Sequence, residues 1–422
     1  MNKKLVALAV AGVFAAPVAV QAADNVTIFG TLNVNFQSTK AGGATNPANN
    51  VSSRTAVSTD SSNIGFRGVE DLGGGLKAVF QCETSANVDG IGVSGICSRN
   101  SNVGLSGAWG TLFYGNWDTP FKAVTYGTKV GDPFLSTDVF AYQSIMGSPG
   151  FNYRSGGWVA GTPTNPTRTT VANVVTGFDI RASNSIAYWT PKWNGLSAKL
   201  QYSATEFESA SGAISPELWS AAVNYDVGGL SLLAAYERHN DGYALGGINP
   251  AAPFKFGATA ANSIAGTTSK DTAWRVGAGY EFKWGAAGAT TLSALYENLK
   301  LEQTGGAAGS VAEFKRDAWQ VALTHRMGNH ELRARYSDAD QGDCALVGGA
   351  ACSTSGYGAK MYALGYAYHF SKRTQGYAFY TKIKNEQNAQ YTFSIGGSPA
   401  VAGSTPAGAD PQAIGVGIRH SF

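Results

Sequence analysis

Long apolar stretches are almost missing from this chain. After residue 22 no uninterrupted apolar run reaches the ~18 residues that a transmembrane helix requires, and the mean hydropathy of −0.10 is that of an ordinary soluble protein. A helical membrane protein is therefore excluded. A charge excess is missing as well, because 31 Lys and Arg stand against 28 Asp and Glu and no basic run occurs. We therefore expect no nucleic-acid partner.

Catalytic and metal-binding motifs are also missing. The chain has five histidines, and none lies in a Gly-x-Ser-x-Gly context or a His-Glu-x-x-His spacing, the patterns that supply a nucleophile or two metal ligands. The glycine-rich stretches fall in loops rather than between a strand and a helix. We expect no enzymatic activity, no metal and no cofactor.

The first residues form a secretory signal. A basic start precedes an apolar run over 5–16, and small residues precede a cleavage site after Ala22. The run is too short to span a bilayer as a helix, and a buried N-terminal helix is the alternative. We predict a signal peptide over 1–22 and a single domain over 23–422, because the pattern described below continues without a boundary.

Cysteine is scarce, and its spacing is informative. The four cysteines fall as two close pairs, Cys82 with Cys97 and Cys344 with Cys352. An exported chain meets an oxidising compartment, and each pair brackets one long connection, which predicts two local disulfides. Four free thiols or a metal site are the alternatives, but no histidine lies near either pair.

The chain does contain a two-faced repeat about ten residues long. Alternating apolar and polar side chains are typical of a β-strand with one face in oil and the other in water. In the clearest example the apolar side chains are Trp274, Val276, Ala278, Tyr280 and Phe282, and Arg275, Gly277, Gly279, Glu281 and Lys283 lie between them. The repeat predicts sixteen strands, at 26–37, 63–69, 76–83, 102–107, 111–117, 181–189, 196–205, 217–227, 230–238, 271–284, 290–301, 315–327, 331–338, 358–370, 374–384 and 413–422.

The connections between these strands alternate strictly between short and long. The short ones contain glycine and asparagine, which supply the positive φ of tight antiparallel turns. They lie at 71–75, 108–110, 192–195, 228–229, 285–288, 328–329 and 371–373. Short turns at one end and long loops at the other are typical of outer-membrane barrels.

The strand count is even, which allows an antiparallel sheet to close on itself. Closure removes the unpaired edges that a bilayer does not tolerate, and sixteen strands leave a water-filled lumen. Aromatic residues near both ends of the strands fit the two interfacial girdles of such a barrel. We predict an all-β fold, a transmembrane antiparallel β-barrel of 16 strands.

Several local strings resemble the general porins of Gram-negative outer membranes, most closely those of betaproteobacteria. These strings lie at 63–73, 99–105, 181–188 and 417–422. The resemblance implies a homotrimer of barrels among outer-membrane lipids and lipopolysaccharide, through which small hydrophilic solutes and ions diffuse passively. It also implies that the long third external loop, about 118–180, folds into the pore, a role that suits its length.

The resemblance further assigns pore-lining residues. It sets loop acids opposite basic residues of the wall, and such opposed charges create a transverse field across a narrow passage. The candidate acids are Asp118, Asp132 and Asp138, the candidate wall residues are Arg67, Arg99 and Arg181, and Lys77 and Glu83 are further inward charges. Asn63 stands where many relatives have another arginine, which argues against a strong anion preference. The inward-facing positions carry more basic than acidic residues, so we predict a weak preference for anions.

The strand period supports two of the three arginines. Arg67 and Arg181 fall on the water-facing parity of their strands. Arg99 shares the parity of outward-facing Val103 and Leu105. It therefore reaches the interior only through a bulge or at the junction between loop and strand.

The last strand ends in an aromatic residue. Ile418, His420 and Phe422 share one parity and resemble the signal that the barrel-assembly machinery reads, although a plain lipid-facing strand has the same pattern. Three other functions remain open from the sequence: a substrate-selective channel, a barrel that binds partners through its loops, and a soluble secreted β protein.

Overall fold

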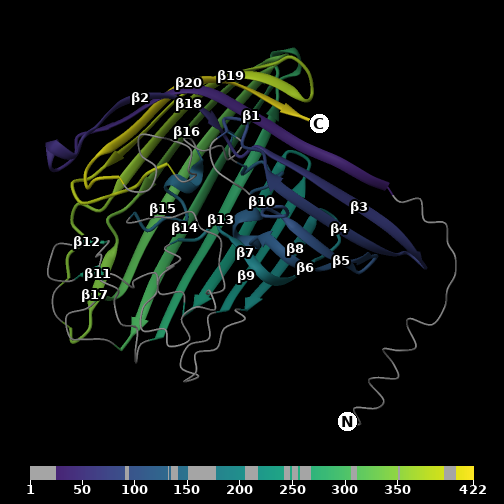
Figure 1. The fold of residues 1–422 in the computed structure, drawn as a ribbon, viewed down its shortest axis with the longest axis horizontal. Coiled ribbons are helices and arrows are strands. Elements are labelled where there is room, and N and C mark those ends of the chain that lie inside the picture. Colours follow the sequence, from purple (N-terminus) through teal and green to yellow (C-terminus); the bar gives the residue numbers. More distant parts are fainter. Residues whose placement is uncertain are drawn as a thin grey trace, which may run out of the picture.

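The structure, a computed structural model, is a barrel (Figure 1). The residues it describes are 25–90, 95–131, 133–134, 141–150, 177–204, 217–241, 248–249, 255–256, 268–305, 311–349, 352–393 and 405–422. The predicted signal peptide at 1–22 lies outside them. No helix in these ranges is both long and apolar enough to cross a bilayer.

Sixteen antiparallel strands form a closed ring among the described residues. Strands that follow one another along the chain pair with each other, and β1 (Asn25–Gly42) closes the ring by pairing with β20 (Asp410–Ser421). The strands between them are β3 (Asn63–Gly73), β4 (Leu76–Ser85), β5 (Ser101–Gly107), β6 (Gly110–Asp118), β7 (Arg181–Trp189), β8 (Leu196–Ala204), β9 (Glu217–Val227), β10 (Leu230–Asn240), β13 (Thr268–Lys283), β14 (Ala289–Thr304), β15 (Val311–Met327), β16 (His330–Ala339), β18 (Ala359–His369) and β19 (Thr374–Asn385).

Two further strands of the same sheet extend the ring rather than add to it. β2 (Val51–Thr59) pairs with the far half of β1, whereas β3 pairs with its near half. In the same way β17 (Asp343–Leu346) pairs with β15 beyond the end of β16. The remaining described elements are β11 (Ile248–Asn249) paired with β12 (Lys255–Phe256), and the short helices η1 (Pro47–Asn49), α2 (Pro120–Ala123), η3 (Tyr142–Ser144) and η4 (Gly285–Ala287).

The predicted fold class and strands are confirmed. β7 and β9 begin and end at the predicted residues, and each predicted short connection joins a hairpin, as at Gly228, where φ is 59°. The pattern missed β2 and β17 and the outer ends of β1, β13, β14 and β15. At those ends the outward face is polar, as at exposed Lys270 of β13, so the apolar half of the alternation stops before the strand does.

The two faces of the ring have opposite chemistry. Apolar side chains point outward and are exposed, including Phe36 (57%), Val103 (62%) and Leu364 (58%). Polar side chains between them point inward and are buried, as Asn33 and Asn35 are in β1. A soluble protein arranges these classes the other way round, so the outer surface is suited to hydrocarbon and the interior to water.

Both predicted disulfides are present. Cys82 of β4 is bonded to Cys97, which precedes β5, and their Cα atoms are 4.6 Å apart. Cys344 of β17 is bonded to Cys352, with Cα atoms 5.7 Å apart. Each disulfide closes a single connection, so both are local staples at the long-loop end of the barrel.

Candidate functional site

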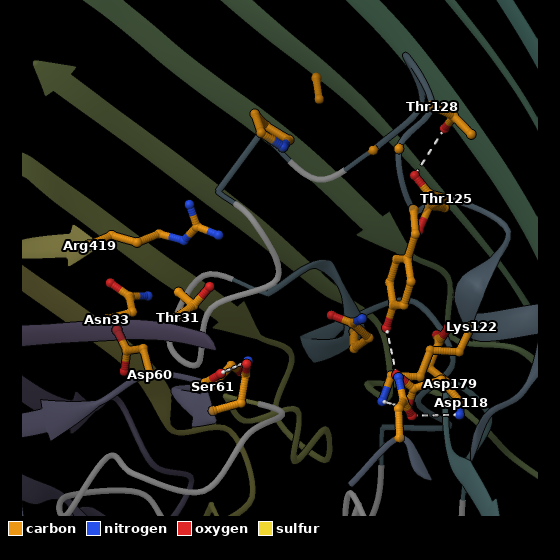
Figure 2. A pocket seen from close by; sticks show the side chains of 18 of the residues that line it. Thr31, Asn33, Asp60, Ser61, Asp118, Lys122, Thr125, Thr128, Asp179 and Arg419 are labelled. Atoms are coloured by element: carbon orange, nitrogen blue, oxygen red, sulfur yellow. Dashed lines mark hydrogen bonds and ion pairs between the residues drawn. The ribbon is translucent and has the colours of Figure 1, made fainter. Parts of the chain in front are cut away.

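A cavity of about 880 Å³ lies on the polar inner face of the ring (Figure 2). Strands from opposite sides of the ring line it, among them β1, β6, β14 and β20, so it is part of the barrel interior. Its charged lining residues are Asp60, Glu83, Arg99, Asp118, Lys122, Lys129, Asp179, Arg181, Glu331 and Arg419. Five are acids and five are bases, so the arrangement of these charges matters more than their number.

One side of the cavity is built by the connection between β6 and β7. Its described residues, 119–131, 133–134, 141–150 and 177–180, are called the inner segment here. Three hydrogen bonds tie it to the inner face of β9 and β10: the Phe121 N–H donates to Ser220 Oγ (3.0 Å), the Lys129 N–H donates to Ser231 Oγ (3.0 Å), and the Asn224 side chain donates to the Val124 carbonyl (2.7 Å). The inner segment therefore packs against polar side chains of the wall.

The inner segment begins with a short helix that presents a lysine to Asp118. In α2 the Thr119 hydroxyl accepts a hydrogen bond from the Lys122 N–H, and Pro120 occupies the first turn, a favourable start for a helix. Lys122 Nζ then lies 3.0 Å from Asp118 Oδ1. The Thr-Pro pair and the four-residue spacing between Asp118 and Lys122 are signals from which this contact could have been predicted.

Asp118 is shared by two cations. Arg181 Nη2 lies 3.1 Å from the Asp118 Oδ1 that Lys122 also contacts. The Asn100 side chain completes the group, because it donates to Asp118 Oδ2 (3.0 Å) and accepts from Arg181 Nε (2.8 Å). The resemblance set a loop acid and a wall arginine on opposite sides; here Asp118 and Arg181 lie in direct contact, on the same side of the cavity.

Arg99 and Glu83 form a second pair beside this group. Arg99 Nε donates to Glu83 Oε1 at 2.5 Å, and both residues line the cavity. Arg99 lies two residues before β5 begins, at the junction between loop and strand that its parity required. The structure thus brings four of the assigned charges, Glu83, Arg99, Asp118 and Arg181, to one side of one cavity.

The other assigned residues are placed elsewhere. Arg67 is exposed and lies over the Phe29 ring (5.1 Å from guanidinium carbon to ring centroid), and Lys77 is exposed beside the short turn of β4; neither lines the cavity. Asp132 and Asp138 lie outside the described residues. Strand period fixes the face on which a residue lies but not its height along the barrel, which is why Arg67 and Lys77 share the inward parity without reaching the cavity.

Arg419 of β20 faces the inner segment from the opposite wall (Figure 2). Its guanidinium points into the cavity near Asn33 and Thr31. Among the described residues the Arg419 side chain makes neither a hydrogen bond nor an ion pair, and another cation, Arg333, lies close enough to repel its charge. The described lining of the cavity therefore presents one positive charge without a partner to the cavity contents.

A buried charge cluster lies behind the inner segment. Arg275 of β13 has no exposed surface, and it donates twice to Asp179, from Nη1 to Oδ1 and from Nη2 to Oδ2, both at 2.7 Å. Its Nη2 also donates to Glu297 of β14 at 2.5 Å, and its guanidinium carbon lies 3.7 Å from the centroid of the Phe121 ring. One wall arginine thus holds both ends of the inner segment, near Phe121 and at Asp179.

A second buried arginine holds the middle of the inner segment. Arg316 of β15 donates to the Ser148 carbonyl (2.8 Å from Nε) and to the Ile145 carbonyl (2.8 Å from Nη2). Glu297 lies between the two arginines, 3.3 Å from Arg316, and it accepts from the Gly147 N–H at 2.6 Å. Three separated stretches of the inner segment therefore meet one network.

Burial in this cluster raises the pKa values of two groups of the inner segment. The pKa of Asp179 is raised to about 6, because the loss of water around the carboxylate outweighs the attraction of Arg275. Burial also raises the pKa of the Tyr142 hydroxyl well above its ordinary value, with the Asp179 charge adding to the effect. Tyr142 is therefore neutral and donates to Asp179 (3.2 Å) while it accepts from Arg275 (3.2 Å).

The chain matches the sequence model of a family described as Gram-negative porin over residues 6–388. It is 28% identical to outer membrane porin protein 32 of Delftia acidovorans, over 100% of both chains. It is 24% identical to major outer membrane protein P.IB of Neisseria lactamica, again over 100% of both chains. Among solved structures it is similar to the anion-selective porin from Comamonas acidovorans, with a TM-score of 0.66 and 25% identity over 94% of this chain and 100% of that one.

Proposed function

The chain belongs to the Gram-negative porin family, and we propose that its barrel is a water-filled channel of the outer membrane through which small hydrophilic solutes and ions diffuse passively, with a weak preference for anions. It is a channel and not an enzyme. The observation that carries the preference is Arg419, whose side chain has no partner among the described residues, whereas every acid in the described lining of the cavity has one.

The charge on each side of the cavity supports anion preference. On the side of the inner segment, Asp118 serves both Lys122 and Arg181, so that group keeps one positive charge. The neighbouring pair of Arg99 and Glu83 is neutral. Two positions therefore offer a positive charge to a passing anion: the Asp118 group on one side and Arg419 on the other.

The acids of the cavity are less able than its bases to interact with a passing ion, because most of them are buried or held by cations. Glu331 is held by Arg333 at 2.6 Å and by His369 at 2.8 Å. Asp179 is held by Arg275, and Asp60 is only 1% exposed and accepts from Ser58 (3.2 Å). In a passage filled with water, exposed and unpaired charges dominate the field that a solute meets. The remaining field is positive but small, which accounts for a weak preference.

In this proposal the inner segment narrows the lumen of each barrel, and the homotrimer contains three such narrowed channels. The fixation of the inner segment to β9, β10, β13 and β15 supports the first point. The homotrimer, and the contacts with outer-membrane lipids and lipopolysaccharide, rest on the resemblance to the family and on the exposed apolar outer face.

We expect the purified protein to form channels in a planar bilayer with a reversal potential that favours chloride over potassium in a KCl gradient. Conductance steps in groups of three would report a trimer. A clear cation preference would contradict the proposed selectivity. Liposome swelling with sugars of increasing size tests the alternative of a substrate-selective channel: a smooth dependence on size supports general diffusion, whereas uptake of one sugar class contradicts it.

We further propose that Phe422 is part of a signal read by the barrel-assembly machinery. Its backbone also closes the ring, because its N–H donates to the Gly30 carbonyl (3.1 Å) and its carbonyl accepts from the Gly30 N–H (3.2 Å). Deleting Phe422 is expected to reduce assembled protein in the outer membrane severalfold, whereas Phe422→Tyr is expected to assemble.

Refolding of the deletion variant in detergent separates the two roles of Phe422. A signal role predicts that the purified variant still folds into a barrel in vitro although it fails to assemble in cells. Failure in both settings would mean that Phe422 acts through ring closure instead, and normal assembly in cells would contradict both roles. The immunoblot of the outer-membrane fraction and the far-UV circular dichroism spectrum of the refolded protein are the measurements.

A further inference from the structure

Arg99 lies in the cavity although its position along the chain predicts the opposite. β4 and β5 pair in regular register from Lys77↔Ser106 to Gln81↔Asn102. Continued without interruption, this register would set Arg99 opposite Thr84 and on the same face as Val103, which is 62% exposed on the outer surface. A one-residue shift moves a strand side chain to the other face. Something must therefore break the register between Arg99 and Asn102, the last regularly paired residue of β5.

The contacts around Arg99 show that break. The Arg99 N–H donates to the Glu83 carbonyl (2.9 Å), one residue away from the position that regular pairing would give. The Glu83 N–H donates to the Ser101 side chain (3.0 Å). The Asn116 side chain supports the displaced backbone by donating to the carbonyls of Ser98 (3.2 Å) and Arg99 (3.0 Å).

The Cys82–Cys97 disulfide sits at this break. Cys82 immediately precedes Glu83, the partner of Arg99, and Cys97 lies two residues before Arg99. Cys97 has a φ of 57°, a left-handed conformation that costs a non-glycine residue free energy and persists only where its surroundings impose it. Its N–H donates to Thr84 Oγ1 (3.0 Å). The covalent bond thus fixes the backbone turn that directs the next residues across the wall.

We propose that the Cys82–Cys97 disulfide positions Arg99 in the pore, so that Cys82 and Cys97 act on ion selectivity without lining the cavity themselves. Without the bond, residues 97–101 relax toward the regular register and the Arg99 side chain leaves Glu83. Glu83 then faces the passage as an unpaired acid, and the preference for anions falls. This inference rests on the proposed anion preference.

The chain provides a matched control for this inference, because its second disulfide, Cys344–Cys352, also closes a loop but adjoins no described residue that lines the cavity. We expect C82S/C97S to lower the chloride-to-potassium permeability ratio about twofold, the scale of one unit charge about 10 Å from the path in water when about 0.1 M salt screens it. C344S/C352S is expected to leave the ratio unchanged. R99Q in the wild-type background is expected to lower it to the same extent as C82S/C97S.

A double-mutant comparison gives the decisive readout. If the disulfide acts through Arg99, adding R99Q to C82S/C97S produces no further decrease in the permeability ratio. An undiminished effect of R99Q in the C82S/C97S background, or a wild-type ratio in C82S/C97S, would overturn the inference. A wild-type protein without anion preference would instead overturn the proposed function, so the two failures are distinguishable.

Reduction after insertion covers the case in which C82S/C97S fails to assemble. In the C344S/C352S background, dithiothreitol added to an inserted channel transfers two electrons and two protons to the remaining disulfide, which yields two thiols and the cyclic disulfide of the reagent. The permeability ratio is expected to fall about twofold during the recording. The control is C82S/C97S/C344S/C352S, in which the ratio is expected to stay constant. If this quadruple variant does not insert, C344S/C352S treated with the oxidised reagent serves as the control. A constant ratio in reduced C344S/C352S would contradict the inference.

Discussion

Replacing Arg275 with methionine is expected to release the inner segment from the barrel wall and to turn a steady channel into a noisy one. Arg275 makes two hydrogen bonds to Asp179 and one to Glu297, all without exposure to water. Removing one partner of a buried ion pair leaves uncompensated charge and costs about 3–5 kcal/mol. Because Asp179 belongs to the inner segment and Glu297 to the wall, this cost falls on the attachment of the inner segment.

The measurement is the single-channel current at constant voltage. In R275M we expect larger current fluctuations and brief partial closures, because the inner segment moves within the lumen, while the far-UV circular dichroism spectrum keeps its β-sheet shape. Lys300→Ala is the matched control. Lys300 also makes two contacts with carboxylates, Glu302 at 2.9 Å and Glu313 at 3.0 Å, but it is about one-third exposed. Exposed pairs contribute about 0–1 kcal/mol, so K300A is expected to keep wild-type noise.

A compensating variant separates lost anchoring from general damage. In R275M the carboxylates of Asp179 and Glu297 lose their shared cation, but Glu297 keeps Arg316 at 3.3 Å. Adding D179N removes the carboxylate that is left without a cation and makes the buried group neutral again, and neutral replacement of buried charges is often tolerated. The double variant R275M/D179N is therefore expected to be quieter than R275M. Wild-type noise in R275M, or greater noise in the double variant, would contradict the role assigned to Arg275.

The barrel could be predicted from the sequence because its two solvents act on every strand. Hydrocarbon outside and water inside impose a period of two, and the alternation locates the strand ends wherever both solvents are present, as at β7 and β9. β2 and β17 were missed because they extend strands beyond the apolar band. There the outer face is also polar, and the pattern carries no information.

The site could be predicted only in part, since most of its geometry comes from contacts outside the strands. Arg181 was found by its parity and Asp118 by resemblance. Lys129 and Asp179 lie in the inner segment, whose neighbours are fixed by tertiary contacts with no repeating pattern. Arg99 was predicted only in part. Its parity required a register break before it could face the interior, but nothing in the sequence linked that break to Cys97.

Charge reversal at Arg419 is expected to convert the anion preference into a cation preference. Arg419 points into the cavity from β20 and has no partner among the described residues, so its charge acts on passing ions without an internal counterion. In water, one unit charge about 5 Å from a monovalent ion contributes ~0.8 kcal/mol, a factor of roughly four in the permeability of that ion. Arg419→Gln removes this contribution, and Arg419→Glu replaces it with one of opposite sign, a combined factor of about fifteen for each ion, in opposite directions for chloride and potassium.

Lys77→Gln and Lys77→Glu are the matched controls, because they change the net charge of the chain equally and lie outside the cavity. At 1 M salt the screening length falls to about 3 Å, so the Lys77 variants are expected to have wild-type reversal potentials while the Arg419 variants keep part of their effect. R419E with an unchanged reversal potential at every salt concentration would refute this role. Equal shifts in the Arg419 and Lys77 variants would contradict it too, since selectivity would then follow net charge. A graded change from Arg to Gln to Glu, found at Arg419 and absent at Lys77, would place the preference at the wall opposite the inner segment.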